Sequence, residues 1–125
     1  MEKIQKFTDL VAWKEGHKLV LAIYKATGAF PREETFALTD QIRRAATSIT
    51  SNIAEGFSKK TAKEKTQFYH TALGSLNELQ SQLITAKDLG YTNPASFKIA
   101  DELSVGVSKL INGLMKTAKT FGSNT

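Results

Sequence analysis

The sequence contains no cysteine, and histidine and proline are each represented by two residues. Without cysteine the chain forms no disulfide, no thiolate metal site and no thiol nucleophile, which effectively excludes redox chemistry. The histidines are His17 and His70, too few for a dedicated transition-metal site. We therefore expect no bound metal and no cofactor.

Enzyme signatures are missing as well. The sequence has no glycine-rich phosphate loop, no Gly-x-Ser-x-Gly elbow and no His-Glu-x-x-His pair, and its carboxylates do not follow the repeats of a di-iron bundle. Glu55 and Glu78 could meet as an acid pair inside a bundle, but a structural carboxylate with satisfied hydrogen bonds is the simpler interpretation without histidines. These absences predict a protein that is not an enzyme.

A long hydrophobic run is also absent. No segment approaches the roughly 18 apolar residues that span a bilayer, and residues 1–6 carry charges with no apolar run behind them. We expect a cytoplasmic protein without a membrane partner.

Apolar residues at intervals of three and four positions are the strongest feature that is present. This spacing predicts amphipathic helices at about residues 10–27, 36–57, 62–89 and 96–121, and no segment competes as a strand. Short connections between such helices favour antiparallel neighbours, and 125 residues are enough for one core. We therefore predict a single all-α domain over residues 1–125, an antiparallel up-down-up-down four-helix bundle.

Several residues predict where these helices begin and end. Gly28 and Gly90 are expected to stop the first and third helices. Thr61 and Glu64 have the spacing of a capping box, with Glu64 reaching back to the backbone of Thr61 at the start of the third helix. Ser96 is expected to cap the fourth helix.

The apolar stripes are wider than a coiled-coil seam, which indicates that the outside of the bundle also buries some surface. Large aromatic residues have two interpretations, because they either close the bundle ends or form this second surface between subunits. They are Trp13, Phe30, Phe36, Phe57 and Phe68.

The chain carries 17 basic and 12 acidic residues, a formal net charge of +5 with a sequence pI near 9.5. This excess favours a polyanionic partner such as RNA or DNA, although a modest positive charge also serves solubility alone. The densest basic segment surrounds the turn between the second and third predicted helices and contains Lys59, Lys60, Lys63 and Lys65. It is either a solvated turn or, where several subunits align it on one rim, a phosphate-binding surface.

Arg43 and Arg44 flank the apolar stripe of the second predicted helix. Adjacent helical residues point about 100° apart, so one guanidinium can reach phosphate while the other lies along a seam between helices. For Arg44 we expect an ion pair, with Glu55 of a neighbouring subunit or with Glu78 of the third predicted helix, and phosphate contact is the alternative.

Separate motifs along the chain together resemble one known family. They are Phe7–Trp13, Ile23-Tyr24, Phe30-Pro31, Gln41–Ala46, Ser51–Gly56, Gly74–Leu79 and Leu89–Tyr91. In order and spacing they resemble the four-helix-bundle proteins encoded in intervening sequences of large-subunit ribosomal RNA, a family formerly labelled as a ribosomal protein and related to the accessory variability protein of diversity-generating retroelements. The resemblance covers nearly the whole chain. Thr50 stands where relatives commonly have proline, so no proline kink is expected there.

This resemblance implies an antiparallel four-helix protomer that assembles into a homopentameric ring with a basic surface. In the retroelement branch such a ring binds a reverse transcriptase and nucleic acid, whereas the role of the intervening-sequence branch is undefined. Carried over to this chain, the resemblance implies packing or subunit contact for Trp13, Tyr24, Arg44, Asn52 and Glu55.

The function predicted from the sequence is therefore that of a noncatalytic, oligomeric helical bundle that binds nucleic acid, with structured RNA as the expected ligand. The expected phosphate contacts are Arg43, Lys59, Lys60, Lys63 and Lys65. The alternative is a protein-interaction module, or an accessory factor for a reverse transcriptase, that docks its partner through an apolar or aromatic rim.

Overall fold

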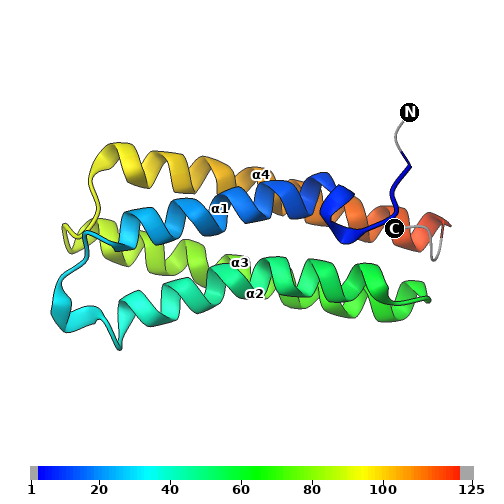
Figure 1. The fold of residues 1–125 in the computed structure, drawn as a ribbon, viewed down its shortest axis with the longest axis horizontal. Coiled ribbons are helices and arrows are strands. Elements are labelled where there is room, and N and C mark those ends of the chain that lie inside the picture. The colour runs from blue at the N-terminus through cyan, green and yellow to red at the C-terminus, as the bar shows by residue number, and fades with distance from the viewer. Residues whose placement is uncertain (1–2, 122–125) are drawn as a thin grey trace.

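The computed structural model describes residues 3–121, and within them the chain forms four long α-helices and no strand. The elements are η1 (Phe7–Asp9), α1 (Val11–Thr27), η2 (Arg32–Glu34), α2 (Leu38–Ser58), α3 (Ala62–Asp88) and α4 (Pro94–Phe121), where η marks a short 3-10 helix. Successive helices run in opposite directions (Figure 1). Each helix packs on its neighbours in sequence, and α1 also packs on α4, which closes the bundle. The predicted all-α four-helix bundle is confirmed.

The core consists of one apolar stripe from each of the four α-helices. Its fully buried members include Leu19 of α1, Ile49 of α2, Leu79 of α3 and Ile111 of α4. Side chains three and four positions apart share one face of a helix, so each helix presents one stripe to the others. Burial of one such side chain contributes about 1.5–3 kcal/mol. No helix within residues 3–121 combines the length and hydropathy needed to cross a membrane.

Two of the predicted helix ends are formed by the expected residues. Thr61 Oγ1 accepts a hydrogen bond from the backbone N–H of Glu64 at 3.1 Å and donates one to Glu64 Oε1 at 2.9 Å. The cap of α3 is therefore present, with the Glu64 carboxylate bound to the Thr61 hydroxyl and not to its backbone. Gly90, beyond the end of α3, has a φ of +78°, the left-handed conformation typical of a helix stop. Gly28 is the residue directly after α1, where a stop was predicted, but its backbone is in the right-handed conformation and not in the left-handed one.

Two helix starts differ from the sequence prediction. α2 begins at Leu38 and not at Phe36, because η2 and the turn after it extend to that point and leave Phe36 95% exposed. α4 begins at Pro94, and Asn93 caps it, since Asn93 Oδ1 accepts a hydrogen bond from the N–H of Ser96 at 2.8 Å. Ser96 is therefore not the cap. Proline is favourable at a first helical position because its missing N–H needs no intrahelical partner there.

Glycine allows α1 to lie close to α2. Gly16 is buried, and a Cβ at this position would lie 3.0 Å from Thr50 Cγ2 and 3.7 Å from Ile53 Cδ1. α2 continues through Thr50 without a break. A Cβ at position 16 would therefore be accommodated only if the Thr50 side chain moved by a few tenths of an ångström.

A second close approach joins α2 to α3 near the turn between them. A Cβ at Gly56 would lie 2.5 Å from Cε1 and 2.8 Å from Cδ1 of Tyr69. Tyr69 has no exposed surface, and burial raises the pKa of its hydroxyl to about 12. The buried ring and the bare Gly56 backbone therefore fit together with no room for a side chain at position 56.

Candidate nucleic-acid interface

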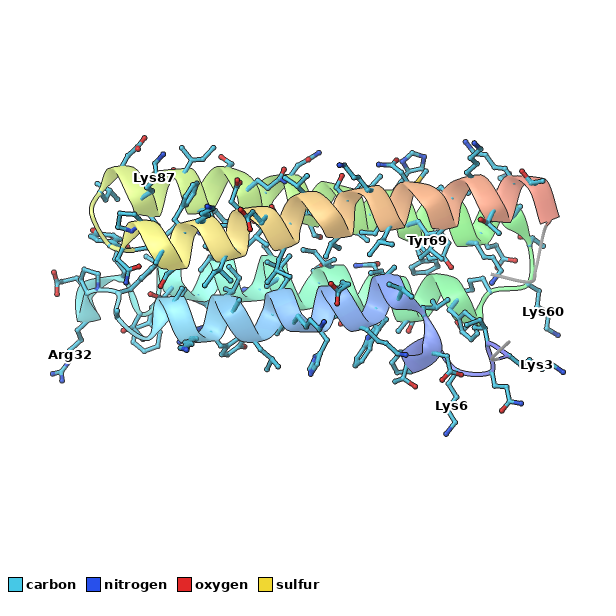
Figure 2. The ribbon with its side chains drawn as sticks, turned by 90° about the horizontal axis from the view of Figure 1, so that it is seen from above. Lys3, Lys6, Arg32, Lys60, Tyr69 and Lys87 are labelled. Carbon is cyan, nitrogen blue, oxygen red and sulfur yellow. The ribbon has the colours of Figure 1, made fainter. Side chains whose placement is uncertain are left out.

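Charge is distributed unevenly along the bundle axis. The N-terminal segment, the α2–α3 turn and the last turns of α4 meet at one end, from which Lys3, Lys6 and Lys60 project (Figure 2). We call this the lysine-rich end and define it by Lys3, Lys6, Lys59, Lys60, Lys63, Lys116 and Lys119. Within residues 3–121, the carboxylates at this end are Asp9, Glu55 and Glu64. At the opposite end, basic residues are offset by Glu33, Glu34, Asp40, Asp88, Asp101 and Glu102.

The predicted lysine cluster at the α2–α3 turn separates into residues with different surroundings. Lys60 and Lys63 are exposed. Lys59 is partly buried, with Nζ 4.0 Å from Glu55 Oε2 and 5.2 Å from the centre of the Phe68 ring. An exposed lysine can approach a phosphate without first breaking internal contacts. Lys60 and Lys63 are therefore better placed for such contacts than Lys59.

Lys65 does not belong to this surface, contrary to the sequence prediction. It is only 1% exposed, and its Nζ donates hydrogen bonds to the carbonyl oxygens of Phe57 at 2.9 Å and Gly56 at 3.4 Å. Carbonyls in the last turn of a helix lack intrahelical partners and carry the negative end of the helix dipole. Burial lowers the pKa of Lys65. Its ammonium group therefore caps α2 inside the protein and is not available to a phosphate.

Arg43 is also engaged within the bundle, and its phosphate contact stays a prediction. Its Nε donates a hydrogen bond to Thr27 Oγ1 at 2.7 Å, and its Nη2 lies 3.5 Å from the carbonyl oxygen of Tyr24. The guanidinium carbon lies 4.6 Å from the centre of the Tyr24 ring. A cation at a helix C-terminus interacts favourably with the helix dipole, so Arg43 fastens α2 to the last turn of α1. Arg43 and Lys59 lie near opposite ends of α2, so the predicted set is not one site.

Replacing Arg43 with alanine should lower the free energy of unfolding by about 2 kcal/mol, because the variant loses a charged hydrogen bond and a cation–π contact. The measurement is urea unfolding followed by circular dichroism. Arg44→Ala is the control and should change stability by less than about 0.5 kcal/mol, since its ion pair is exposed. Equal stability of the two variants would contradict a role for Arg43 in holding α1 to α2.

Arg44 lies at a polar groove between α2 and α3. Its Nη1 is 3.9 Å from Asp40 Oδ2, one turn earlier, and its side chain is 79% exposed. The predicted partner Glu78 lines the same groove of about 270 Å³, but its Oε1 accepts a hydrogen bond from Gln82 at 3.1 Å. The intrachain pair of Arg44 is therefore with Asp40 and not with Glu78. A pair with a neighbouring subunit stays a prediction.

The other polar residues assigned to packing or subunit contact lie along the same two helices. Asn52 Nδ2 donates to the carbonyl oxygen of Ser48 at 2.8 Å, and the hydroxyls of Ser48 and Ser75 are hydrogen-bonded at 2.7 Å between α2 and α3. Asn52 therefore supports a polar seam between these helices. Glu55 and Glu78 are both exposed, so the acid pair considered inside the bundle is not formed.

Aromatic residues of η1 and α1 form contacts that were not predicted from the sequence. Trp13 packs partly on the core, its ring is stacked on His17 at a centroid distance of 4.9 Å and an angle of 9°, and Phe7 meets it edge-on at 5.4 Å. Tyr24 is 44% exposed beneath the Arg43 guanidinium. The spacing of Trp13 and His17, four positions apart, was the available signal, because such residues are neighbours on a helix surface.

Comparisons with known proteins agree with this architecture. A crystal structure of a protein with unknown function from the S23 ribosomal protein family of Bacteroides thetaiotaomicron is 21% identical, with a TM-score of 0.77 over 86% of this chain and 96% of that chain. At this identity the likeness shows the fold. No curated protein matches the sequence significantly. The sequence profile of the 23S rRNA-intervening sequence proteins matches residues 8–113, most of the chain. The chain therefore belongs to the 23S rRNA-intervening sequence protein family.

Proposed function

We propose that this protein is a noncatalytic, oligomeric helical bundle that binds structured RNA through phosphate contacts at its lysine-rich end. The observation that carries the proposal is the separation of charge along the bundle axis, with Lys60 and Lys63 exposed at one end and carboxylates offsetting the basic residues at the other. A concentrated positive surface attracts the nucleic-acid backbone and releases its condensed counterions. Membership in a family named for intervening sequences of 23S rRNA makes RNA the first ligand to test.

Binding of this kind depends on the backbone and is insensitive to base sequence. The exposed groups that would make the contacts are lysine ammoniums, which approach phosphates as point charges and do not read base edges as a bidentate side chain can. We therefore expect affinity to fall steeply as salt rises and to vary little among hairpins of different sequence.

The double variant Lys60→Glu/Lys63→Glu should weaken binding of a labelled RNA hairpin at least about tenfold at low salt. It should also reduce the slope of log affinity against log salt by about two, since two phosphate contacts are lost. Fluorescence anisotropy at several salt concentrations measures both quantities.

The matched control is Arg32→Glu/Lys87→Glu, which changes net charge equally at the opposite end (Figure 2). This control should bind the hairpin with less than about threefold change, because its charges lie away from the contact surface. Equal losses in the two double variants would mean that net charge alone attracts RNA. Affinity that does not respond to salt would remove the proposed mechanism.

Self-association belongs to the same proposal and is supported by an apolar groove between α1 and α4. The groove has a volume of about 320 Å³. Its lining consists of Ile99, Leu103, Gly106, Val107 and Leu110 of α4, together with Glu102 of α4 and Glu15 of α1. Ile99 is 57% exposed, so its side chain gains burial when a second copy covers the groove. Repetition of the protomer around a ring would place several lysine-rich ends side by side, and their fields would add.

Replacing Ile99 with glutamate should convert the oligomer to a monomer, because the variant places a charge in an apolar contact. Size-exclusion chromatography with light scattering measures the mass, and a pentamer is the expected wild-type assembly. Val105→Glu, also on α4 and exposed but outside the lining of this groove, is the comparison. A monomeric wild-type protein would contradict the assembly, whereas an Ile99→Glu variant that stays oligomeric would place the interface elsewhere.

A protein-docking function is the second candidate, favoured by the nearly complete exposure of Phe36 and by exposed Leu89. Both residues lie beyond helix ends away from the lysine-rich end, and an exposed aromatic side chain is a common anchor of a protein interface. In this case the hairpin would not bind at any salt concentration, and Phe36→Ser would abolish capture of a protein partner such as a reverse transcriptase.

A further inference from the structure

The parallel stack of Trp13 and His17 lies on the surface of α1, and its two rings differ in their exposure to solvent. Trp13 is partly buried and packs against the core, whereas His17 is exposed. Their ring centroids are 4.9 Å apart with an angle of 9°, and the edge-on Phe7 ring holds Trp13 from η1 at 5.4 Å. The inner ring is therefore held by the core and by Phe7, and the outer ring stacks on it and is exposed to solvent.

Lysines surround this stack. Lys14 and Lys18 are exposed on α1 next to the stacked pair, and Lys3 and Lys6 project from the segment that leads into η1 (Figure 2). Glu15 Oε2 pairs with Lys18 at 2.8 Å, so these two side chains add no net charge, and Lys3, Lys6 and Lys14 supply the positive charge near the rings. Asp9 Oδ2 accepts backbone N–H bonds from residues 5 and 6, each at 3.0 Å, which lower the pKa of Asp9. The surroundings of the rings therefore favour an anionic ligand with a flat, stackable part.

From this juxtaposition we infer that the Trp13–His17 stack is a platform for an unpaired nucleobase, so that the protein prefers RNA with single-stranded segments to fully paired RNA. A base that lies on the outer face of His17 would extend the stack by one ring, while the exposed Lys14 contacts an adjoining phosphate. Bases in a duplex already stack on each other and cannot reach a protein ring in this way. The inference rests on the proposed function and names the form of RNA that is bound.

The test uses the intact protein, a single-stranded RNA of mixed sequence and a blunt duplex of the same length. Trp13 is the only tryptophan in the chain, so its fluorescence reports on the stack directly. We expect single-stranded RNA to change the Trp13 emission at saturation and the duplex to leave it nearly unchanged. We expect His17→Ala to weaken binding of the single strand by about fivefold or more, as for loss of one base–aromatic contact, with duplex affinity unaffected.

His70→Ala is the matched control, because His70 is an exposed histidine on α3. It should retain wild-type affinity for both RNAs, and thermal unfolding of both histidine variants checks that they are folded. A His17→Ala variant with unchanged single-strand affinity, or with equal losses for both RNAs, would overturn the platform. So would unchanged Trp13 emission in the complex with single-stranded RNA.

The experiment distinguishes failure of the stacking platform from failure of the proposed RNA-binding function. If both RNAs bind with salt-dependent affinity and lose it in Lys60→Glu/Lys63→Glu, the basic surface stands whatever His17→Ala does. If neither RNA binds at low salt, both the platform and the RNA-binding function are rejected.

Discussion

A valine at position 56 should destabilise the bundle by about 3 kcal/mol and lower its Tm by about 10 °C, because a Cβ there would already lie 2.5 Å from the Tyr69 ring. Tyr69 is fully buried, so the ring cannot swing into solvent, and either α2 or α3 must shift. Repacking of two long helices disturbs every contact along their seam. Thermal and urea unfolding followed by circular dichroism measure the effect.

Gly74 provides the control within the same bundle. It lies on α3, is exposed, and a Cβ there would meet nothing within 4 Å. Gly74→Ala should therefore raise stability by up to about 1 kcal/mol through helix propensity. A double-mutant cycle with Gly56→Ala and Tyr69→Leu should show that the two changes cost less together than the sum of each alone. Full additivity, or a Gly56→Val protein as stable as wild type, would contradict this close approach.

Lys65→Ala should lower the free energy of unfolding by about 3 kcal/mol. The variant loses the buried aliphatic stem of the lysine, worth about 0.8 kcal/mol per methylene group, and leaves the carbonyls of Gly56 and Phe57 without the ammonium donor. Relief from burying a charge offsets part of this loss. Urea unfolding of the purified variant measures the change.

Two comparisons separate the structural role of Lys65 from the role first predicted for it. Lys65→Met keeps the stem and should recover about half of the lost stability, whereas Lys63→Ala should change stability by less than about 0.5 kcal/mol because Lys63 is exposed. RNA affinity should show the reverse order, with a loss in Lys63→Ala and none in Lys65→Met. A Lys65→Met protein that is fully stable but binds RNA weakly would restore Lys65 to the phosphate-contacting surface.

Helix positions followed from the sequence because apolar spacing is a local property. Each of the four predicted spans differs from the observed helix by at most about two residues at either end. The start of α2 was missed because η2 and its turn precede it, and the start of α4 was missed because a polar side chain decides it. Asn93 and Ser96 are both good capping residues, and the choice between them depends on Pro94, which favours the first helical position.

The candidate site was harder to predict because a lysine run does not reveal which side chains face inward. Lys65, Tyr69, Ala72 and Leu76 are separated by four, three and four positions and share the buried face of α3, so the pattern that predicted the core also contained Lys65. The prediction of a phosphate contact rested on the charge of Lys65 and not on its spacing. The contact of Arg43 with Thr27 had no such local signal, since it joins two helices whose relative register comes only from tertiary packing.

The topology also determines how the protein can be handled. An even number of antiparallel helices brings the N-terminal segment and the end of α4 to the same end of the bundle (Figure 1), and this is the end that carries Lys3, Lys60 and Lys119. A purification tag or fused reporter joined before Lys3 or after Phe121 would therefore be attached at the end of the bundle that carries these lysines. A polyhistidine or acidic tag could add or mask charge where ligand is expected. An affinity handle inserted between Gly28 and Phe36, at the far end, would leave the lysine surface uncovered.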